Sequence, residues 1–542
     1  MLGDEVGVRR LSAKAATLIV AIAVLCAGCG SSSTVQKTGT GATASFYTGG
    51  TPGGTPVHGG KAVIDLAEAP ASLDPVAVPT TASADVSLQI SEGLLETLPG
   101  SKEVHPDLAA SWTISPDGLT YTFHIREGVH FSNGEPLTGE DVVYSIERQK
   151  LPIAGYGTLI APEIANISLV NPMTVQIRLK HVTAAFLSDF ALAQTSIVPK
   201  NVVAHESQKI FALHPIGTGP FILKSASAGF TNIVMVRNPH YWRSGQPYLN
   251  ELVWNQVVEA NARILAAQSG AATIDLSVPF SQAATLQKGS GGRVLIEPIL
   301  SESLADFNNL SAPFTNENVR KALNYATPRE AIIKSVFKGL GIAANNVTNN
   351  LFTYYDPNVP VFPYDIAKAK ELLKDSPVPN GFNTSIMIYS GDPTSSLIAS
   401  ILQSSWAQIG VHLNIRALPP ASFQAEELKR SYGMFLWTPE FLVSEQYEPD
   451  VTYGEFAGPN AVPFFKIDTP RGTKLIEEAS ATLSTQRRAK LFPEIQKLMI
   501  WEEAQFLPIA FVPQINLVSN ALRGYNYPPN SYFHMREAWL AG

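Results

Sequence analysis

Residues 109–142 read AASWTISPDGLTYTFHIREGVHFSNGEPLTGEDV, and they carry most of the information about how this chain folds. Within them Tyr121, Phe123 and Ile125 alternate with polar residues, which is the period of a half-buried strand. Asp-Gly and Asn-Gly dipeptides interrupt the pattern, and both favour tight turns. The stretch therefore predicts short strands joined by turns.

Helical patterns alternate with strand-like ones along the rest of the chain, which predicts a mixed α/β globule. Asp365 is placed to cap a helix over residues 366–374. Thr327, followed by Pro328 and by Glu330, predicts a second helix start with the Thr327 side chain as its cap.

Composition excludes several classes of protein. The chain has 542 residues and is 45% hydrophobic, which is enough to bury large cores and rules out disorder throughout. Its 39 basic and 46 acidic residues give a net charge of −7, so we expect no nucleic-acid partner. Two cysteines cannot build a disulfide scaffold.

The N-terminus has the features of an export signal. In residues 1–28, three basic residues precede an apolar run that is too short to favour a permanent membrane helix. The sequence Leu-Cys-Ala-Gly-Cys at 25–29 resembles a bacterial lipoprotein box, which implies that Cys29 receives a diacylglycerol group. The alternative is an ordinary secretory signal, and export by the Sec or the twin-arginine route stays open. Residues 29–59 are rich in Ser, Thr, Gly and Pro and predict a flexible tether.

Catalytic and metal-binding motifs give no positive signal. No histidine pair has the helical spacing of a zinc site, and there is no Gly-x-Ser-x-Gly elbow. The glycines at 339–341 follow a predicted helix, whereas a dinucleotide-binding loop follows a strand. We therefore predict no enzymatic activity, no cofactor and no bound metal.

The opening stretch closely resembles the signature of the peptide/nickel-type solute-binding proteins of ABC importers. The resemblance runs from about residue 60 to the C-terminus, and most matched residues fit turns or core positions. Further matches follow in the family's order: Leu-Asp-Pro at 73–75, Gly-Thr-Gly-Pro-Phe at 217–221, Asn-Pro-His-Tyr-Trp at 238–242, Asn308 with Pro-Phe at 313–314, and Val-Arg-Lys-Ala-Leu-Asn-Tyr-Ala at 319–326.

The resemblance implies a two-lobed clamp of the periplasmic-binding-protein type, which closes on a ligand. We expect a hinge where the chain crosses between the lobes and an inserted subdomain in lobe one. The predicted parts are lobe one at 60–300 plus 510–542, its inserted subdomain at about 97–215, lobe two at 301–509, and hinge crossings near 300–307 and 507–514.

Peptide-binding members carry a Trp-x-x-Asp-Tyr stretch whose aspartate pairs with the α-ammonium group of the peptide. In this sequence Trp437 matches, Glu440 replaces the aspartate and Phe441 replaces the tyrosine. The resemblance therefore implies that Glu440, Trp437, Phe441 and Asn308 bind the ligand. The alternative is that Glu440 is a solvated loop carboxylate and Trp437 an ordinary core residue.

The implied function is capture of short peptides and their delivery to an ABC permease with its ATPase subunits. We expect a monomer, held by its lipid on the outer face of the cell membrane. The same fold could instead bind a nickel chelate, an oligosaccharide, an opine-like compound or haem. A sensory lipoprotein and an exported hydrolase are the alternatives from other functional classes.

Overall fold

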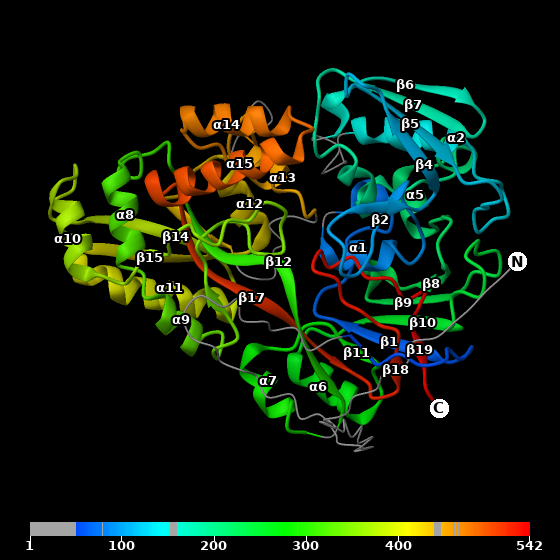
Figure 1. Cartoon of the computed structure of the whole chain (residues 1–542). Helices are drawn as coiled ribbons and strands as arrows, with labels where there is room; N and C mark the ends of the chain where they lie inside the picture. Colours follow the sequence, from blue (N-terminus) through cyan, green and yellow to red (C-terminus); the bar gives the residue numbers. More distant parts are fainter. Residues whose placement is uncertain are drawn as a thin grey trace, which may run out of the picture. The chain divides into compact units, whose positions relative to one another are not determined.

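Two long antiparallel strands, β12 (Arg293–Phe307) and β17 (Phe506–Val518), form the centre of the largest sheet (Figure 1). One flank of the pair continues through β17 to β11, and the other continues through β12 to β16. The computed structural model describes residues 50–78, 80–151, 160–289, 291–437, 446–458, 461–462 and 465–542.

The large sheet has two halves that meet at β12 and β17. In the first half β1 pairs in parallel with β10 and β11, and in the second half β14 pairs in parallel with β15 and β16. The remaining strands are β8 (Phe221–Ala226), β9 (Asn232–Arg237), β10 (Glu251–Gln256), β1 (Lys61–Leu66), β11 (Ile274–Asp275), β16 (Met434–Trp437), β14 (Phe382–Tyr389), β15 (Val411–Leu418) and β13 (Ile342–Ala343), which pairs with β17.

Three smaller sheets complete the β-structure of the described residues. They are the four-stranded sheet β4 (Ala109–Ile114), β5 (Thr120–Ile125), β7 (Thr174–Leu179) and β6 (Ile164–Asn171), and the pairs β2 (Leu95–Thr97) with β3 (Val104–Pro106) and β18 (Leu522–Arg523) with β19 (Trp539–Leu540).

Helices pack on these sheets in two groups. Those of the N-terminal part are α1 (Thr81–Ser87), α2 (Gly139–Glu147), α4 (Lys200–Val203), α5 (Gln208–Leu213), α6 (Ala260–Ser269) and α7 (Phe280–Leu286). Those of the C-terminal part are α8 (Glu317–Tyr325), α9 (Arg329–Ser335), α10 (Ile366–Lys374), α11 (Pro393–Trp406), α12 (Pro420–Leu428), α13 (Pro449–Phe456), α14 (Pro470–Ser480) and α15 (Thr485–Gln496), followed by a π-helical stretch at Lys497–Glu502.

The pairing of β12 with β17 is interrupted at one point. Between Pro298 and Glu302 the register shifts, and the amide of Leu300 donates to the Pro529 carbonyl at 2.7 Å instead of to a neighbouring strand. The predicted hinge crossings lie on these two strands. The boundaries assigned to the lobes, the inserted subdomain and the tether stay predictions, although the Thr51 amide already donates to the Tyr525 carbonyl at 2.9 Å.

Local patterns in the sequence are largely confirmed. The alternating residues Tyr121, Phe123 and Ile125 lie on β5 and are buried. The Asp365 side chain accepts a hydrogen bond from the Lys368 amide at 2.8 Å, so it caps α10 as predicted. Together these elements give the mixed α/β fold that the sequence indicated.

The predicted cap at Thr327 is wrong. Helix α9 begins at Arg329 and has no side-chain cap, because the Thr327 hydroxyl donates to the Leu323 carbonyl at 2.7 Å. That hydroxyl also accepts a hydrogen bond from the Trp406 indole at 3.3 Å. A buried threonine thus satisfies two tertiary partners in place of its own helix, which local sequence rules do not anticipate.

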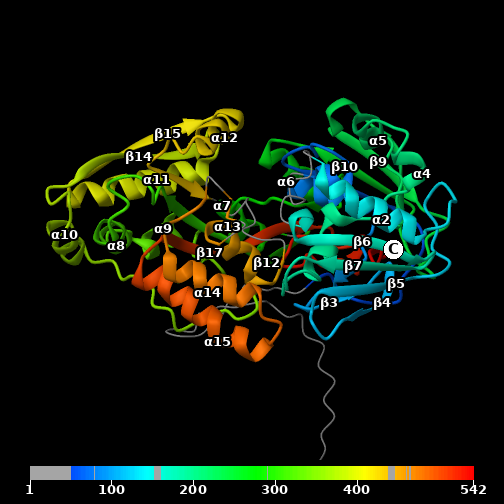
Figure 2. The same ribbon diagram turned by 90° about the horizontal axis from the view of Figure 1, so that it is seen from above.

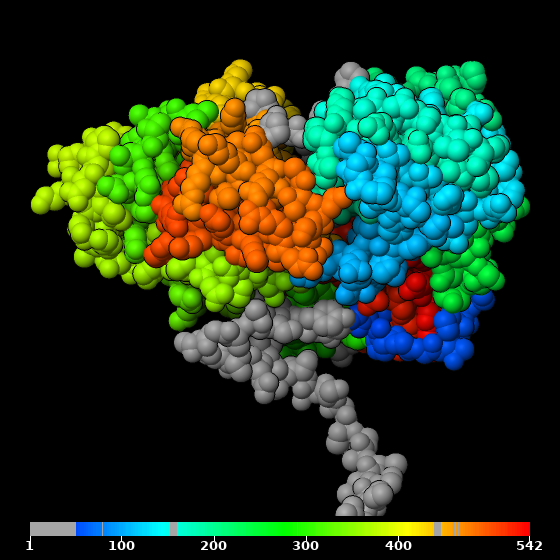
Figure 3. Space-filling view, turned by 45° about the horizontal axis from the view of Figure 1, so that its top comes forward, coloured from blue at the N-terminus to red at the C-terminus, as the bar shows by residue number. Residues whose placement is uncertain are grey.

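The four-stranded sheet and the helices α13–α15 contact one another. The Ala184 amide, after β7, donates to the Ser480 carbonyl at 2.8 Å, and Lys102 Nζ donates to the Phe352 carbonyl at 2.9 Å. Figure 2 shows α14 and α15 on the side of this sheet, and in Figure 3 the orange atoms of these helices adjoin blue and cyan atoms. Among the described residues no helix is long and apolar enough to cross a membrane.

Candidate ligand-binding site

Trp437 is the predicted site residue whose surroundings are clearest. It ends β16, lies opposite Leu304 of β12, and is half-buried. Its indole Nε1 donates to Asp306 Oδ2 at 2.6 Å, and its ring packs edge-on against Phe435 at a centroid distance of 5.4 Å. The other predicted contacts that follow it, Glu440 and Phe441, lie outside the described residues, as does Cys29.

Asn308 lies just beyond the end of β12 and is buried. Its side-chain Nδ2 donates to the carbonyls of Arg430 at 3.1 Å and Tyr432 at 3.0 Å. Its own amide donates to the Gly433 carbonyl at 2.9 Å. The structure therefore places Asn308 as a brace that holds the segment leading into β16 and Trp437. The prediction that it also contacts the ligand stays a prediction.

Two acidic residues that were not predicted lie on the same strand as the hinge crossing. Side chains alternate along a strand, so Glu302, Leu304 and Asp306 share one face of β12. Leu304 packs on this face with Tyr453 of α13, whereas Ala305 packs into the core on the opposite face. We call Glu302 and Asp306, together with Glu427 of α12, the acidic face.

Burial shifts the ionisation of the acidic face. Loss of hydration raises the pKa of Asp306 to about 7, although the hydrogen bond from Trp437 partly offsets this effect. Burial also raises the pKa of Glu427 to about 7. The pKa of Glu302 lies well above its usual range, first because of burial and second because of the nearby charge of Asp306. Among the described residues, no lysine or arginine lowers the pKa of these three acids.

Aromatic and polar groups line the same side of the sheet. The Tyr453 hydroxyl donates to Asn346 Oδ1 at 2.6 Å, and burial together with the charge of Glu302 raises the pKa of this tyrosine. Phe435 contacts both Trp437 and Tyr432 edge-on. An apolar lining with a few acceptors is the usual make-up of a small-molecule site.

A further contact joins the four-stranded-sheet region to the segment just beyond residue 445. Gln446 Nε2 donates to Asp189 Oδ1 at 2.8 Å, and both side chains are buried. Burial raises the pKa of Asp189 to about 7, while the carboxylates of Glu163 and Asp450 raise it further and the Gln446 hydrogen bond lowers it. The contact is therefore sensitive to pH near neutrality.

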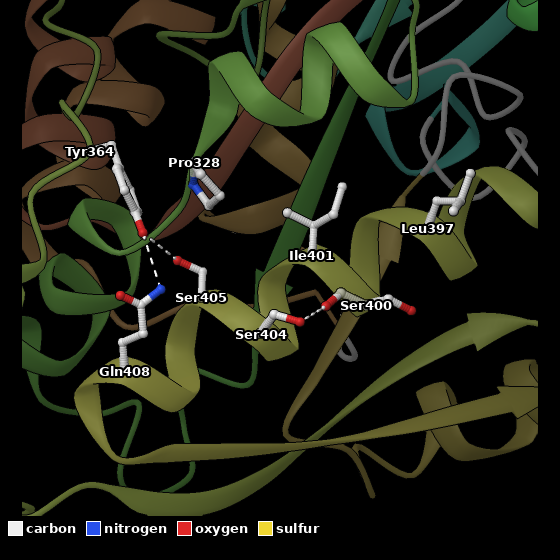
Figure 4. Close-up of a pocket in the computed structure, with 8 residues that line it drawn as sticks. All are labelled: Pro328, Tyr364, Leu397, Ser400, Ile401, Ser404, Ser405 and Gln408. Carbon is white, nitrogen blue, oxygen red and sulfur yellow. Dashed lines mark hydrogen bonds between the residues drawn. The ribbon is translucent and has the colours of Figure 1, made fainter.

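A surface pocket of about 380 Å³ lies elsewhere, on helix α11 (Figure 4). Its polar wall includes the Tyr364 hydroxyl, which accepts hydrogen bonds from Ser405 at 3.1 Å and Gln408 at 3.5 Å. Helix α11 covers the face of β14 that presents Ile386 and Ile388, whereas Met387 points to the side of Phe435. The pocket is thus across the sheet from Trp437 and does not belong to the predicted site.

Metal binding finds no support in the part of the chain that the structure describes. No group of three or more His, Cys, Asp or Glu side chains there is arranged to hold a metal ion. The acidic face is consequently described below as a site for organic cations.

Comparison with known proteins assigns the family. Residues 103–447 match the sequence profile described as bacterial extracellular solute-binding proteins, family 5 Middle. The chain belongs to this family of solute-binding proteins. Because the family consists of binding proteins, this solute-binding protein is not an enzyme.

Relatives agree along almost the whole chain. The glutathione-binding protein GsiB of Salmonella typhimurium is 30% identical over 480 residues, which cover 86% of this chain and 92% of the relative. Among solved structures, AgaA of A. tumefaciens R10 in complex with agropinic acid is 26% identical with a TM-score of 0.77, covering 89% and 99% of the two chains. A dipeptide-binding protein from Pseudoalteromonas sp. SM9913 in complex with Met-Leu is 23% identical with a TM-score of 0.79, covering 89% and 100%. These likenesses confirm the two-lobed periplasmic-binding-protein fold.

Reading the sequence missed the acidic face, although its pattern was present. The segment at 300–307 was interpreted as a hinge crossing, and its alternation of Glu302, Leu304 and Asp306 within an otherwise buried strand was not considered. Acids on a fully buried strand are unusual and mark a position that needs explanation.

Proposed function

We propose that this solute-binding protein captures short peptides between its two lobes and delivers them to an ABC permease with its ATPase subunits. The observation that supports a peptide most directly is the position of Trp437. It lies on the acidic face, hydrogen-bonded to Asp306, and immediately precedes the segment that carries Glu440 and Phe441. A peptide brings an α-ammonium group to such acceptors and an apolar body to the aromatic side chains.

The proposed contacts divide by chemistry. Glu440 accepts a charge-assisted hydrogen bond from the peptide ammonium group, while Trp437 and Phe441 provide apolar contact. Asn308 supports them by fixing the segment before β16, and a direct contact from it to the ligand is part of the same proposal. An unpaired ammonium group is costly to bury, so the carboxylate at 440 selects for ligands with a free amine.

The ligand of the GsiB relatives fits this chain less well. Glutathione carries two carboxylates for one ammonium group, and the acidic face holds three carboxyl groups with no cation that lowers their pKa among the described residues. Like charges brought together without water repel strongly. We therefore place neutral and basic peptides before glutathione as ligands.

Export and anchoring complete the proposal. We propose that the signal at residues 1–28 directs export, that Cys29 carries lipid, and that the protein acts as a monomer on the outer face of the cell membrane. A single acyl chain anchors only marginally, so stable attachment relies on the several acyl groups that a bacterial lipoprotein carries.

A thermal-shift panel tests the ligand class. The mature protein is heated with di-, tri- and tetra-alanine, glutathione, agropinic acid, maltotriose and a nickel–histidine chelate. A ligand at a hundredfold excess over Kd stabilises the protein by about 2.7 kcal/mol, which is a measurable shift in Tm. We expect the alanine peptides to raise Tm. A shift with agropinic acid, sugar or chelate and none with any peptide contradicts the proposal.

A further inference from the structure

Glu302 is a buried acid that the predicted site does not use. It follows the register shift on β12, where the large sheet passes from one half to the other, and its side chain has no exposed surface. Neither of its carboxyl oxygens has a hydrogen-bond partner among the described residues. Leaving a buried acceptor unbonded costs stability, and leaving a buried charge unpaired costs much more.

The position of Glu302 connects this unbonded carboxyl to the proposed site. It shares a face of β12 with Asp306, which binds Trp437, and it interacts electrostatically with both Asp306 and Tyr453. The groups around Tyr453 are neutral, since its hydroxyl is bonded to Asn346 and lies 3.4 Å from the Thr348 hydroxyl. No described side chain supplies a positive charge to Glu302.

Other buried acids of this chain differ in this respect. Asp275 binds Arg263 at 3.0 Å and Asp74 binds Arg148 at 2.6 Å, each within the fold. A purely structural acid is expected to have such a partner. The missing partner of Glu302 therefore points to a group that arrives from outside the chain.

We propose that Glu302 binds a second cationic group of the ligand, so that the preferred solutes are short peptides with a lysine-like or arginine-like side chain. This inference rests on the proposed peptide-binding function and narrows it. The ammonium or guanidinium group donates hydrogen bonds to the Glu302 carboxylate, and the charge of Asp306 adds to the attraction. Because Glu302 is fully covered in this structure, the cation reaches it when the elements packed on that face separate, as a two-lobed clamp allows.

The test compares peptides that differ by one charge. Alanine tetrapeptides carry a single lysine, or its uncharged analogue norleucine, at each position in turn, and Kd is measured by isothermal titration calorimetry at pH 7. In the wild-type protein we expect lysine to bind about tenfold or more tightly than norleucine at one position, as a hydrogen bond to a charged group implies. Glu302→Gln should lose this preference and keep its affinity for the norleucine peptide. The control Glu330→Gln, on an exposed residue of α9, should retain it.

A second readout needs no variant. A cation that binds Glu302 displaces the proton held by this raised-pKa carboxyl, so the lysine peptide should release about one proton more than its norleucine partner. Titrations in buffers of different ionisation enthalpy measure this difference, and a merely structural acid leaves it at zero.

The outcomes separate the two proposals. If peptides bind but lysine and norleucine are equivalent at every position, the assignment of Glu302 is overturned while the peptide-binding function stands. If lysine is preferred equally by Glu302→Gln, the cation is recognised elsewhere and the assignment is again overturned. If no peptide binds the wild-type protein, the proposed function itself fails.

Discussion

Replacing Asp306 by asparagine should change how the stability of the protein depends on pH. The Asp306 side chain is 5% exposed, and burial raises its pKa to about 7 from an ordinary value of 3.8. The folded state thus holds a proton that the unfolded chain releases. The resulting stability is fully present below the ordinary pKa and is lost as the pH rises through 7.

The expected magnitude follows from these values. Between pH 5 and the folded pKa lie roughly two pH units, and each changes the free energy of unfolding by about 1.4 kcal/mol. The wild-type protein should therefore lose about 2.7 kcal/mol relative to Asp306→Asn between pH 5 and pH 8. The asparagine oxygen can still accept the hydrogen bond from Trp437, so the fold is retained.

Urea unfolding followed by circular dichroism at pH 5, 6, 7 and 8 measures this difference. Asp375→Asn, which changes an exposed carboxyl at the end of α10, serves as the control and should follow the wild-type curve. Parallel curves for Asp306→Asn and the wild type would show that Asp306 is not a buried, unpaired acid, and the description of the acidic face would have to be withdrawn.

Three further predictions follow from other parts of the structure. The Gln446–Asp189 contact should weaken as the pH rises through the raised Asp189 pKa of about 7. The wild-type protein should then expand between pH 6 and 8 in small-angle X-ray scattering, while Asp189→Asn should not. Arg243→Met should lower the free energy of unfolding by about 3–5 kcal/mol in urea titrations, since Arg243 pairs with the buried acids Glu96 at 2.7 Å and Asp107 at 2.6 Å. A loss below about 1 kcal/mol contradicts that account. Cys29→Ser should move the protein from the membrane to the soluble fraction in cell fractionation, and unchanged membrane association refutes lipid anchoring.

Much of the fold could be predicted because local rules determine local structure. The alternation at Tyr121, Phe123 and Ile125 and the cap at Asp365 depend on neighbours a few residues away, and both are confirmed. Thr327 shows the limit of such rules. Its hydroxyl is bonded to Leu323 and to Trp406, and the second of these partners is 79 residues away.

The candidate site was less predictable because its key contacts join distant segments. Trp437 was found through a motif, but its bond to Asp306 spans 131 residues and depends on β12 pairing with β16. Glu302 is defined by what does not surround it, and a sequence does not show which partners a side chain lacks. Glu440 and Phe441 stay predictions that rest on the motif.

The central claim, that this solute-binding protein holds the ammonium group of a short peptide, is tested most directly by blocking that group. The measurement is the Kd of tetra-alanine against that of N-acetyl-tetra-alanine, by isothermal titration calorimetry at pH 7. The account predicts that acetylation weakens binding about tenfold or more, as loss of a charged hydrogen bond implies. Equal affinity for the two peptides would contradict it.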